Sequence, residues 1–113
     1  MILECKQENK FIELDIRYCK GGFNNWTGLP QDRCYNLHIT PVEKFGNGFI
    51  IGAFSGIIIN SEPLARDSKF AKQKALDYFN KNIEQIKNII YKVCSKNNLE
   101  LKNNLENLEL KEI

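Results

Sequence analysis

The residues best suited to chemistry lie in one glycine-rich segment, residues 20–28, between two strand-like stretches. The segment holds three glycines, the only tryptophan of the chain, Trp26, and the side chains of Phe23, Asn24 and Asn25. Glycine lets a backbone approach a ligand closely, and an aromatic ring in a connection either caps the core or stacks on a flat partner. Rings beside amides therefore suggest a flat, polar ligand such as a nucleotide or a nucleic acid.

Arginine is scarce in this chain, and its three copies lie near this segment or where the expected sheet meets the expected helix. A guanidinium binds phosphate through paired hydrogen bonds better than an ammonium does. We therefore expect phosphate contacts from the basic residues, stacking from the two rings and hydrogen bonds from Asn24 and Thr27. The predicted ligand-binding residues of this region are Arg17, Lys20, Phe23, Asn24, Trp26, Thr27, Arg33 and Arg66. The alternative is that Trp26 covers one face of the sheet and binds nothing.

The sequence shows no catalytic constellation, and we expect neither enzymatic activity nor a cofactor. His38, the only histidine, falls on the polar side of its strand near Asp15 or Glu13, without an obvious nucleophile. It is most simply a surface histidine. Neither a phosphate-binding loop of the G-x-x-x-x-G-K-[ST] type nor a dinucleotide-binding fingerprint is present.

The four cysteines show no C-x-x-C spacing, so we expect no metal site and reduced thiols. A labile disulfide between Cys19 and Cys34, which bracket the glycine-rich connection, stays open. The N-terminal residues do not resemble a secretory signal, and no apolar run is long enough to span a bilayer. We expect a cytoplasmic protein without membrane contact.

Alternating side chains predict an antiparallel sheet within residues 11–60. In residues 11–19 apolar side chains alternate with Glu13, Asp15 and Arg17, and residues 34–42 alternate in the same way up to Pro41. The two strands are expected to pair through residues 20–33. Residues 49–54 predict a third strand and residues 57–60 a fourth, so the sheet has three or four strands.

Residues 68–97 predict one long helix with a single apolar stripe. The stripe comprises Leu76, Phe79, Ile83, Ile86, Ile90 and Val93. At about 1.5 Å per residue such a helix overshoots the sheet, which predicts a homo-oligomer, a dimer or larger, formed through the helix. Tyr78 and Asn88 on its back face could then complete a neighbouring subunit's pocket. Residues 101–113, with Leu101, Leu105 and Leu108, predict a short second helix or a tail.

The charge distribution favours a small anionic ligand over a nucleic acid. The net charge is only +2, and the basic surplus lies within residues 66–96, where most such runs form a solvated helix face. The exposed strand face offers Glu13, Asp15 and Asn36, which would not attract a phosphate chain. Nucleic acid is therefore the second choice of partner.

Three runs resemble small proteins carried by phages and conjugative elements. They are R-Y-x-K-G-G-x-N-x-x-T-G from Arg17, R-x-Y-x-L-x-I-x-P-V from Arg33 and A-F-S-G-I from Ala53. The expected architecture also resembles the first-described anti-Thoeris sponge family. That resemblance implies an N-terminal antiparallel sheet, long C-terminal helices, self-assembly and sequestration of cyclic ADP-ribose-type signals without cleavage.

We thus predict one α+β domain over residues 1–113, with a sheet followed by a long helix and a short one. The expected function is non-enzymatic sequestration of a cyclic nucleotide immune signal. The alternatives are a nucleic-acid-binding accessory protein of a mobile element and a direct protein inhibitor of a defence nuclease.

Overall fold

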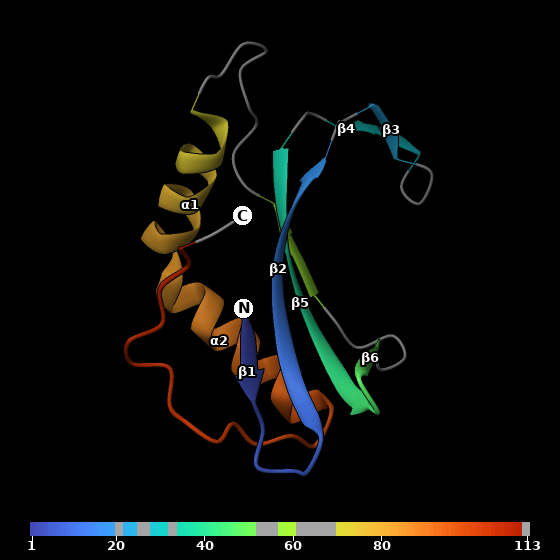
Figure 1. The fold of residues 1–113 in the computed structure, drawn as a ribbon. Coiled ribbons are helices and arrows are strands. Elements are labelled where there is room, and N and C mark those ends of the chain that lie inside the picture. Colours follow the sequence, from blue (N-terminus) through green and yellow to red (C-terminus); the bar gives the residue numbers. More distant parts are fainter. Residues whose placement is uncertain (20–21, 25–27, 32–33, 52–56, 61–69, 112–113) are drawn as a thin grey trace.

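The computed structural model describes most of the chain as one sheet, a small hairpin, two helices and a C-terminal tail (Figure 1). The described residues are 1–19, 22–24, 28–31, 34–51, 57–60 and 70–111. The strands are β1 (Ile2–Glu4), β2 (Lys10–Cys19), β3 (Gly22–Asn24), β4 (Leu29–Gln31), β5 (Cys34–Phe45), β6 (Gly48–Ile51) and β7 (Ile57–Asn60). The helices are α1 (Ala71–Lys81) and α2 (Ile83–Lys96). The predicted α+β class, an antiparallel sheet followed by helices, is confirmed.

The main sheet has the order β1-β2-β5-β6, and β7 pairs with β5 as well. Its spine is the antiparallel ladder of β2 with β5, which runs from Lys10 opposite Glu43 to Cys19 opposite Cys34. This is the pairing predicted through residues 20–33. The described residues give this sheet five strands instead of three or four, because β1 was not foreseen, and β3 with β4 forms a separate two-stranded hairpin.

The predicted alternation sorts these strands into an inner and an outer face. Ile12, Leu14 and Ile16 of β2 are buried beside Leu37 and Ile39 of β5, facing the helices. Burying such side chains is the main favourable term in folding. A shift of one residue in the register would exchange the two faces.

Tyr18 is the exception, because it continues the alternation of the buried residues of β2 and yet is 46% exposed. It lies one residue from the end of β2, where the strand has passed beyond its pairing with β1. Its ring meets that of Tyr35 edge-on, with 5.5 Å between centroids.

Pro41 does not end its strand, which continues to Phe45. The Leu14 amide donates to the Met1 carbonyl, so even-numbered residues of β2 point their backbone groups away from β5. Pro41 lies opposite Ile12 and therefore directs its nitrogen away from β2. On that side β7 pairs with residues 36–39 and β6 with residues 42–45. The missing N–H thus falls between two strands, the edge position that proline tolerates.

The predicted helix over residues 68–97 is two helices that meet at Asn82 (Figure 1). The Asn82 side-chain amide donates to the Tyr78 carbonyl at 2.8 Å, and its backbone N–H contacts the carbonyls of Tyr78 and Phe79. A side chain that competes for a helical carbonyl in this way bends or ends a helix. The predicted start, residue 68, lies outside the described residues.

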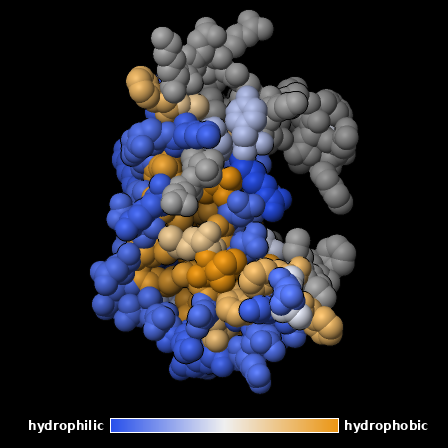
Figure 2. All heavy atoms as spheres, viewed as in Figure 1, coloured by the Kyte–Doolittle hydropathy of each residue, from blue (hydrophilic) through white to orange (hydrophobic). Residues whose placement is uncertain are grey.

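The apolar stripe itself is confirmed across both helices. Phe79, Ile86, Ile90 and Val93 are at most 2% exposed and pack in the core under the sheet. Figure 2 shows the apolar side chains gathered between helices and sheet, with polar side chains over the outer helix surfaces. Because the helix bends at Asn82, its length no longer requires a second subunit to cover it.

The predicted short helix over residues 101–113 is absent from the described residues 101–111, which form an irregular tail. The tail runs beside β1. There the backbone amide of Lys6 donates to the Glu100 carbonyl at 2.7 Å, and the backbone amide of Lys102 donates to the Glu4 carbonyl at 2.9 Å. These bonds flank an antiparallel bridge between Cys5 and Leu101 and attach the start of the tail to the chain that follows β1. Apolar side chains of the tail still enter the core, with Leu99, Leu105 and Leu110 buried.

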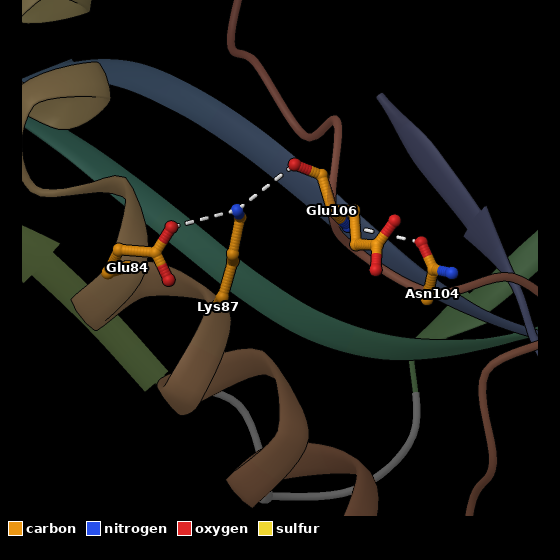
Figure 3. A network of polar contacts seen from close by, with 4 residues as sticks. All are labelled: Glu84, Lys87, Asn104 and Glu106. Carbon is orange, nitrogen blue, oxygen red and sulfur yellow. Dashed lines mark hydrogen bonds and ion pairs between the residues drawn. The ribbon is translucent and has the colours of Figure 1, made fainter.

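Lys87 of α2 also holds the tail (Figure 3). Its ammonium lies 3.0 Å from a Glu84 carboxylate oxygen and 3.3 Å from the Glu106 carbonyl oxygen. The Glu106 amide in turn donates to the Asn104 side-chain oxygen at 3.2 Å. These polar contacts attach the tail to α2, and the buried side chains of sheet, helices and tail form one core.

Candidate functional site

The candidate site is the face of the sheet that points away from the helices. Along β2 this outer face carries Glu13, Asp15 and Arg17, and along β5 it carries Asn36 and His38. The core residues occupy the other face, to which the described helices pack. We call Asp15, Arg17, Asn36, His38 and Ile58 the outer-face patch.

Strand register brings the outer-face patch together from three strands. Asp15 of β2 lies opposite His38 of β5, which lies opposite Ile58 of β7. The next outer-face row places Arg17 opposite Asn36. Neighbouring strands lie about 4.8 Å apart, so one small ligand can reach all five side chains.

Arg17 is the predicted site residue that the structure places in this patch. Its Nε donates to Asp15 Oδ2 at 2.6 Å, and both side chains remain about half exposed. Within the described residues the rest of the guanidinium makes no hydrogen bond. An exposed ion pair of this kind adds little stability, and it leaves donors of Arg17 for a ligand.

His38 is a neutral imidazole at pH 7. Burial lowers its pKa from the ordinary 6.5, the nearby Arg17 guanidinium lowers it further, and the Asp15 carboxylate acts in the opposite direction. A neutral imidazole presents one N–H donor and one nitrogen acceptor. His38 can therefore pair with a ligand group of either kind.

The β3–β4 hairpin follows the end of β2 and lies on the side of the sheet opposite the helices (Figure 1). Phe23 pairs with Pro30 and Asn24 with Leu29 in the hairpin backbone. Gly28 has a φ of +70° at the turn, a conformation that favours glycine. The hairpin thus follows the Arg17 end of the sheet and includes Phe23 in β3, with Trp26 between its two strands in the sequence.

Several predicted site residues cannot be placed relative to this patch. The side chains of Phe23 and Asn24 are outside the described part of the chain. So are the whole residues Lys20, Trp26, Thr27, Arg33 and Arg66. Their roles stay predictions.

Tyr78 and Asn88 lie on the helices, across the sheet from the outer-face patch. The placement of Tyr78 on the back face was wrong. It is half-buried against the core, three residues along α1 from the buried Ala75, and meets the Phe79 ring edge-on, with 5.8 Å between centroids. Asn88 is exposed, as expected.

The residues predicted from the sequence did not include Asn36, His38 and Ile58, which the strand register places in the outer-face patch. The signal was the alternation itself, because residues 36 and 38 share the face of β5 that continues the face of Arg17 on β2. Ile58 could not be found in this way, since the pairing of β7 with β5 is not visible from its own four residues.

Cys19 and Cys34 lie opposite each other at the end of the β2–β5 ladder, as the predicted bracket requires. The Cys34 thiol lies 3.3 Å from the Asn36 side-chain oxygen. The side chain of Cys19 is not described, so a disulfide stays a prediction. In the described ranges no three His, Cys, Asp or Glu side chains gather as metal ligands.

Two hollows of the described surface lie away from the outer-face patch. One of about 270 Å³ opens between β2 and the end of the tail, lined by Met1, Leu14, Ile16, Leu110 and Lys111. A shallower one of about 550 Å³ lies between the end of α2 and the tail. Neither of these two hollows includes a residue of the outer-face patch.

None of the described helices is long and apolar enough to cross a bilayer. Comparisons of the chain with protein-family models, with curated proteins and with solved structures find no match.

Proposed function

We propose that this chain is an anti-defence protein of a phage or mobile element that binds and sequesters a cyclic nucleotide of the cyclic ADP-ribose type. The supporting observation is the position of Arg17. It lies on the outer face of the sheet, at the end from which the chain enters the segment containing Phe23 and Trp26. A guanidinium suits a phosphate, and the rings of Phe23 and Trp26, a few residues later in the sequence, suit a flat base.

Binding without conversion fits the chemistry of the outer-face patch. Asn36, His38 and Arg17 offer hydrogen bonds, and none of the five side chains of the patch is a hydroxyl, a thiol or an amine. Under the proposal the protein acts by stoichiometry, lowering the free signal below the level to which its effector responds.

The charges favour a small ligand over a nucleic acid. Glu13 and Asp15 lie on the same face as Arg17, within the path that an extended phosphate chain would take across the strands. Like charges would weaken such a complex. A compact ligand can instead keep its phosphates at the Arg17 end and its uncharged base over the remainder of the patch.

Self-association remains part of the proposal, now supported by exposed aromatic residues. Phe70 at the start of α1 is 69% exposed, and Tyr91 on α2 is 46% exposed. Aromatic side chains of this kind are enriched at protein interfaces. Asn88 is on the exposed surface of α2 and stays a candidate for contact with a second copy.

Titration calorimetry with cyclic ADP-ribose tests the proposal. We expect saturable binding by the full chain, weakened at least about tenfold by Arg17→Ala and by Trp26→Ala, because each removes a phosphate or stacking contact. Lys10→Ala is the matched control, since Lys10 is also an exposed basic residue of β2 in an ion pair, with Glu43. Equal affinity in wild type, Arg17→Ala and Trp26→Ala would refute the assignment of the site.

Mass spectrometry of the bound fraction tests sequestration. After denaturation we expect cyclic ADP-ribose to be released unchanged and in stoichiometric amount. Release of a hydrolysed product would show an enzyme, which contradicts the proposal.

A further inference from the structure

A row of side chains across the outer face remains unused by the proposed phosphate contact. Asp15, His38 and Ile58 come from three adjacent strands and lie in register. Asp15 and His38 are half-buried, so their side chains are held in place and can still be reached, and Ile58 is 58% exposed. A ligand on this row would contact the exposed isoleucine with a flat apolar surface. It would also need hydrogen-bonding groups for the polar side chains beside the isoleucine.

The charges give this row a direction. Glu13 and Asp15 lie toward one end of β2, and Arg17 lies toward the end that leads into the hairpin segment. Lys20 is in that segment and Arg33 directly precedes β5. A ligand with a charged end is therefore favoured with its phosphates at Arg17, away from Glu13.

We propose that the sheet surface around His38 and Ile58 binds the heterocyclic base of the nucleotide, and that His38 determines which base is accepted. This inference rests on the proposed function. The face of the base covers Ile58, and its polar edge meets the imidazole of His38, with Asn36 beside it. The phosphates lie at Arg17, one outer-face row away.

The protonation of His38 makes it a selective group. At pH 7 it is neutral and offers one donor and one acceptor, because burial and Arg17 lower its pKa while Asp15 only partly offsets them. Glu13 is the other charged group on this face of β2, and Asn36, Thr40 and Ile58 on the neighbouring strands do not titrate. A base whose edge leaves one imidazole nitrogen unpaired loses affinity, which is how a polar site discriminates between related ligands.

Two probes separate this inference from a general phosphate site. Cyclic ADP-ribose and cyclic inosine diphosphate ribose share both phosphates and both sugars, but the second carries oxygen instead of nitrogen on carbon 6 of the base. We expect calorimetry to show about a tenfold difference in Kd between them for the wild type. His38→Ala should weaken binding of the preferred probe about tenfold and reduce the difference to below about twofold. Lys44→Ala on the same strand is the control and should change neither.

The single histidine allows a second measurement on the unaltered protein. Its imidazole gives one resolvable NMR resonance, which should shift on saturation with cyclic ADP-ribose and titrate at a different pH in the complex. This measurement holds even where His38→Ala fails to fold.

The outcomes distinguish the two proposals. If Arg17→Ala weakens binding while His38→Ala keeps the wild-type affinity and selectivity, or if the histidine resonance does not move at saturation, the assignment of the base site is overturned and the proposed function stands. If the wild type binds neither probe, both proposals fail.

Discussion

Asn80 of α1 binds both backbone groups of Leu110 in the tail. Its side-chain nitrogen donates to the Leu110 carbonyl at 2.8 Å, and its side-chain oxygen accepts from the Leu110 amide at 2.8 Å. The amide of asparagine thus replaces the neighbouring strand that an extended segment would otherwise need. Leu110 is only 4% exposed and packs into the core from this position.

Replacing Asn80 should detach the end of the tail. Asn80→Ala leaves two partly buried backbone groups without their partners, so we expect a loss of about 1–3 kcal/mol in the free energy of unfolding. Urea unfolding followed by circular dichroism measures it. Asn107→Ala, an exposed asparagine of the tail itself, is the control and should change stability by less than about 0.5 kcal/mol. Equal stability of both variants would contradict this reading of the contact.

The tail should contribute to the core in proportion to the burial of its leucines. Leu105 is 5% exposed, whereas Leu108 is only half-buried. Leu105→Ala is expected to lose about 2–5 kcal/mol through lost burial and the cavity left behind. Leu108→Ala should lose clearly less. Thermal unfolding of the pair gives the comparison, and the reverse order of melting temperatures would show that the tail does not pack as described.

Stability should fall as the pH drops below about 6.5, in part because of His38. Its pKa is lowered in the folded protein from the ordinary 6.5. The unfolded chain therefore takes up a proton first as the pH falls, and this favours unfolding. Unfolding free energies of the wild type and His38→Gln, measured between pH 5 and pH 7.5, should diverge in slope. Parallel curves for the two proteins would mean that the pKa of His38 is the same in the folded and unfolded states.

Removing Arg17 should raise the pKa of His38, because the guanidinium is one of the groups that lower it. NMR titration of the single imidazole in Arg17→Ala measures the change directly. Lys44→Ala, farther along the same sheet, should leave the histidine titration unchanged. A pKa that falls or stays constant in Arg17→Ala would contradict the described proximity.

Cys94 should resist both ionisation and modification. Burial and the neighbouring Cys5 raise the pKa of its thiol from 9.0 to about 11. Because the unfolded thiol loses its proton first, the free energy of unfolding should decline as the pH rises from about 9 to 11. The decline should be smaller for Cys94→Ala. At pH 8 peptide mapping after iodoacetamide treatment should find Cys94 unmodified in the folded protein and modified in urea. Rapid labelling of Cys94 in the folded protein would contradict the described burial of its thiol.

Strand periodicity carried most of what the sequence could reveal. The two faces of β2 and β5 follow from alternation alone. Where one face of a strand is buried, an alternating pattern fixes which residues lie on that face. The apolar stripe of the helices was equally readable. The bend at Asn82 could not be read from the sequence. An asparagine within an apolar pattern does not reveal that its side chain will bind the carbonyl four residues earlier and interrupt the helix.

The tail shows where helical spacing misleads. Leu101, Leu105 and Leu108 fit a helix face, yet the backbone of this segment binds β1 and Asn80 instead. Such partners lie about 30 to 100 residues away in the sequence, and no local pattern records them. The same limit explains Ile58, whose place beside His38 depends on the pairing of β7 with β5.

The division of β2 and β5 into two faces separates two kinds of selection on the same strands. Under the proposed function, substitutions at Asp15, Arg17 or His38 would alter ligand binding, whereas substitutions at Leu14 or Leu37 would alter the stability of the fold. Neighbouring positions in the sequence would then serve different requirements, and a lineage could change its ligand through alternate residues while the core stays intact.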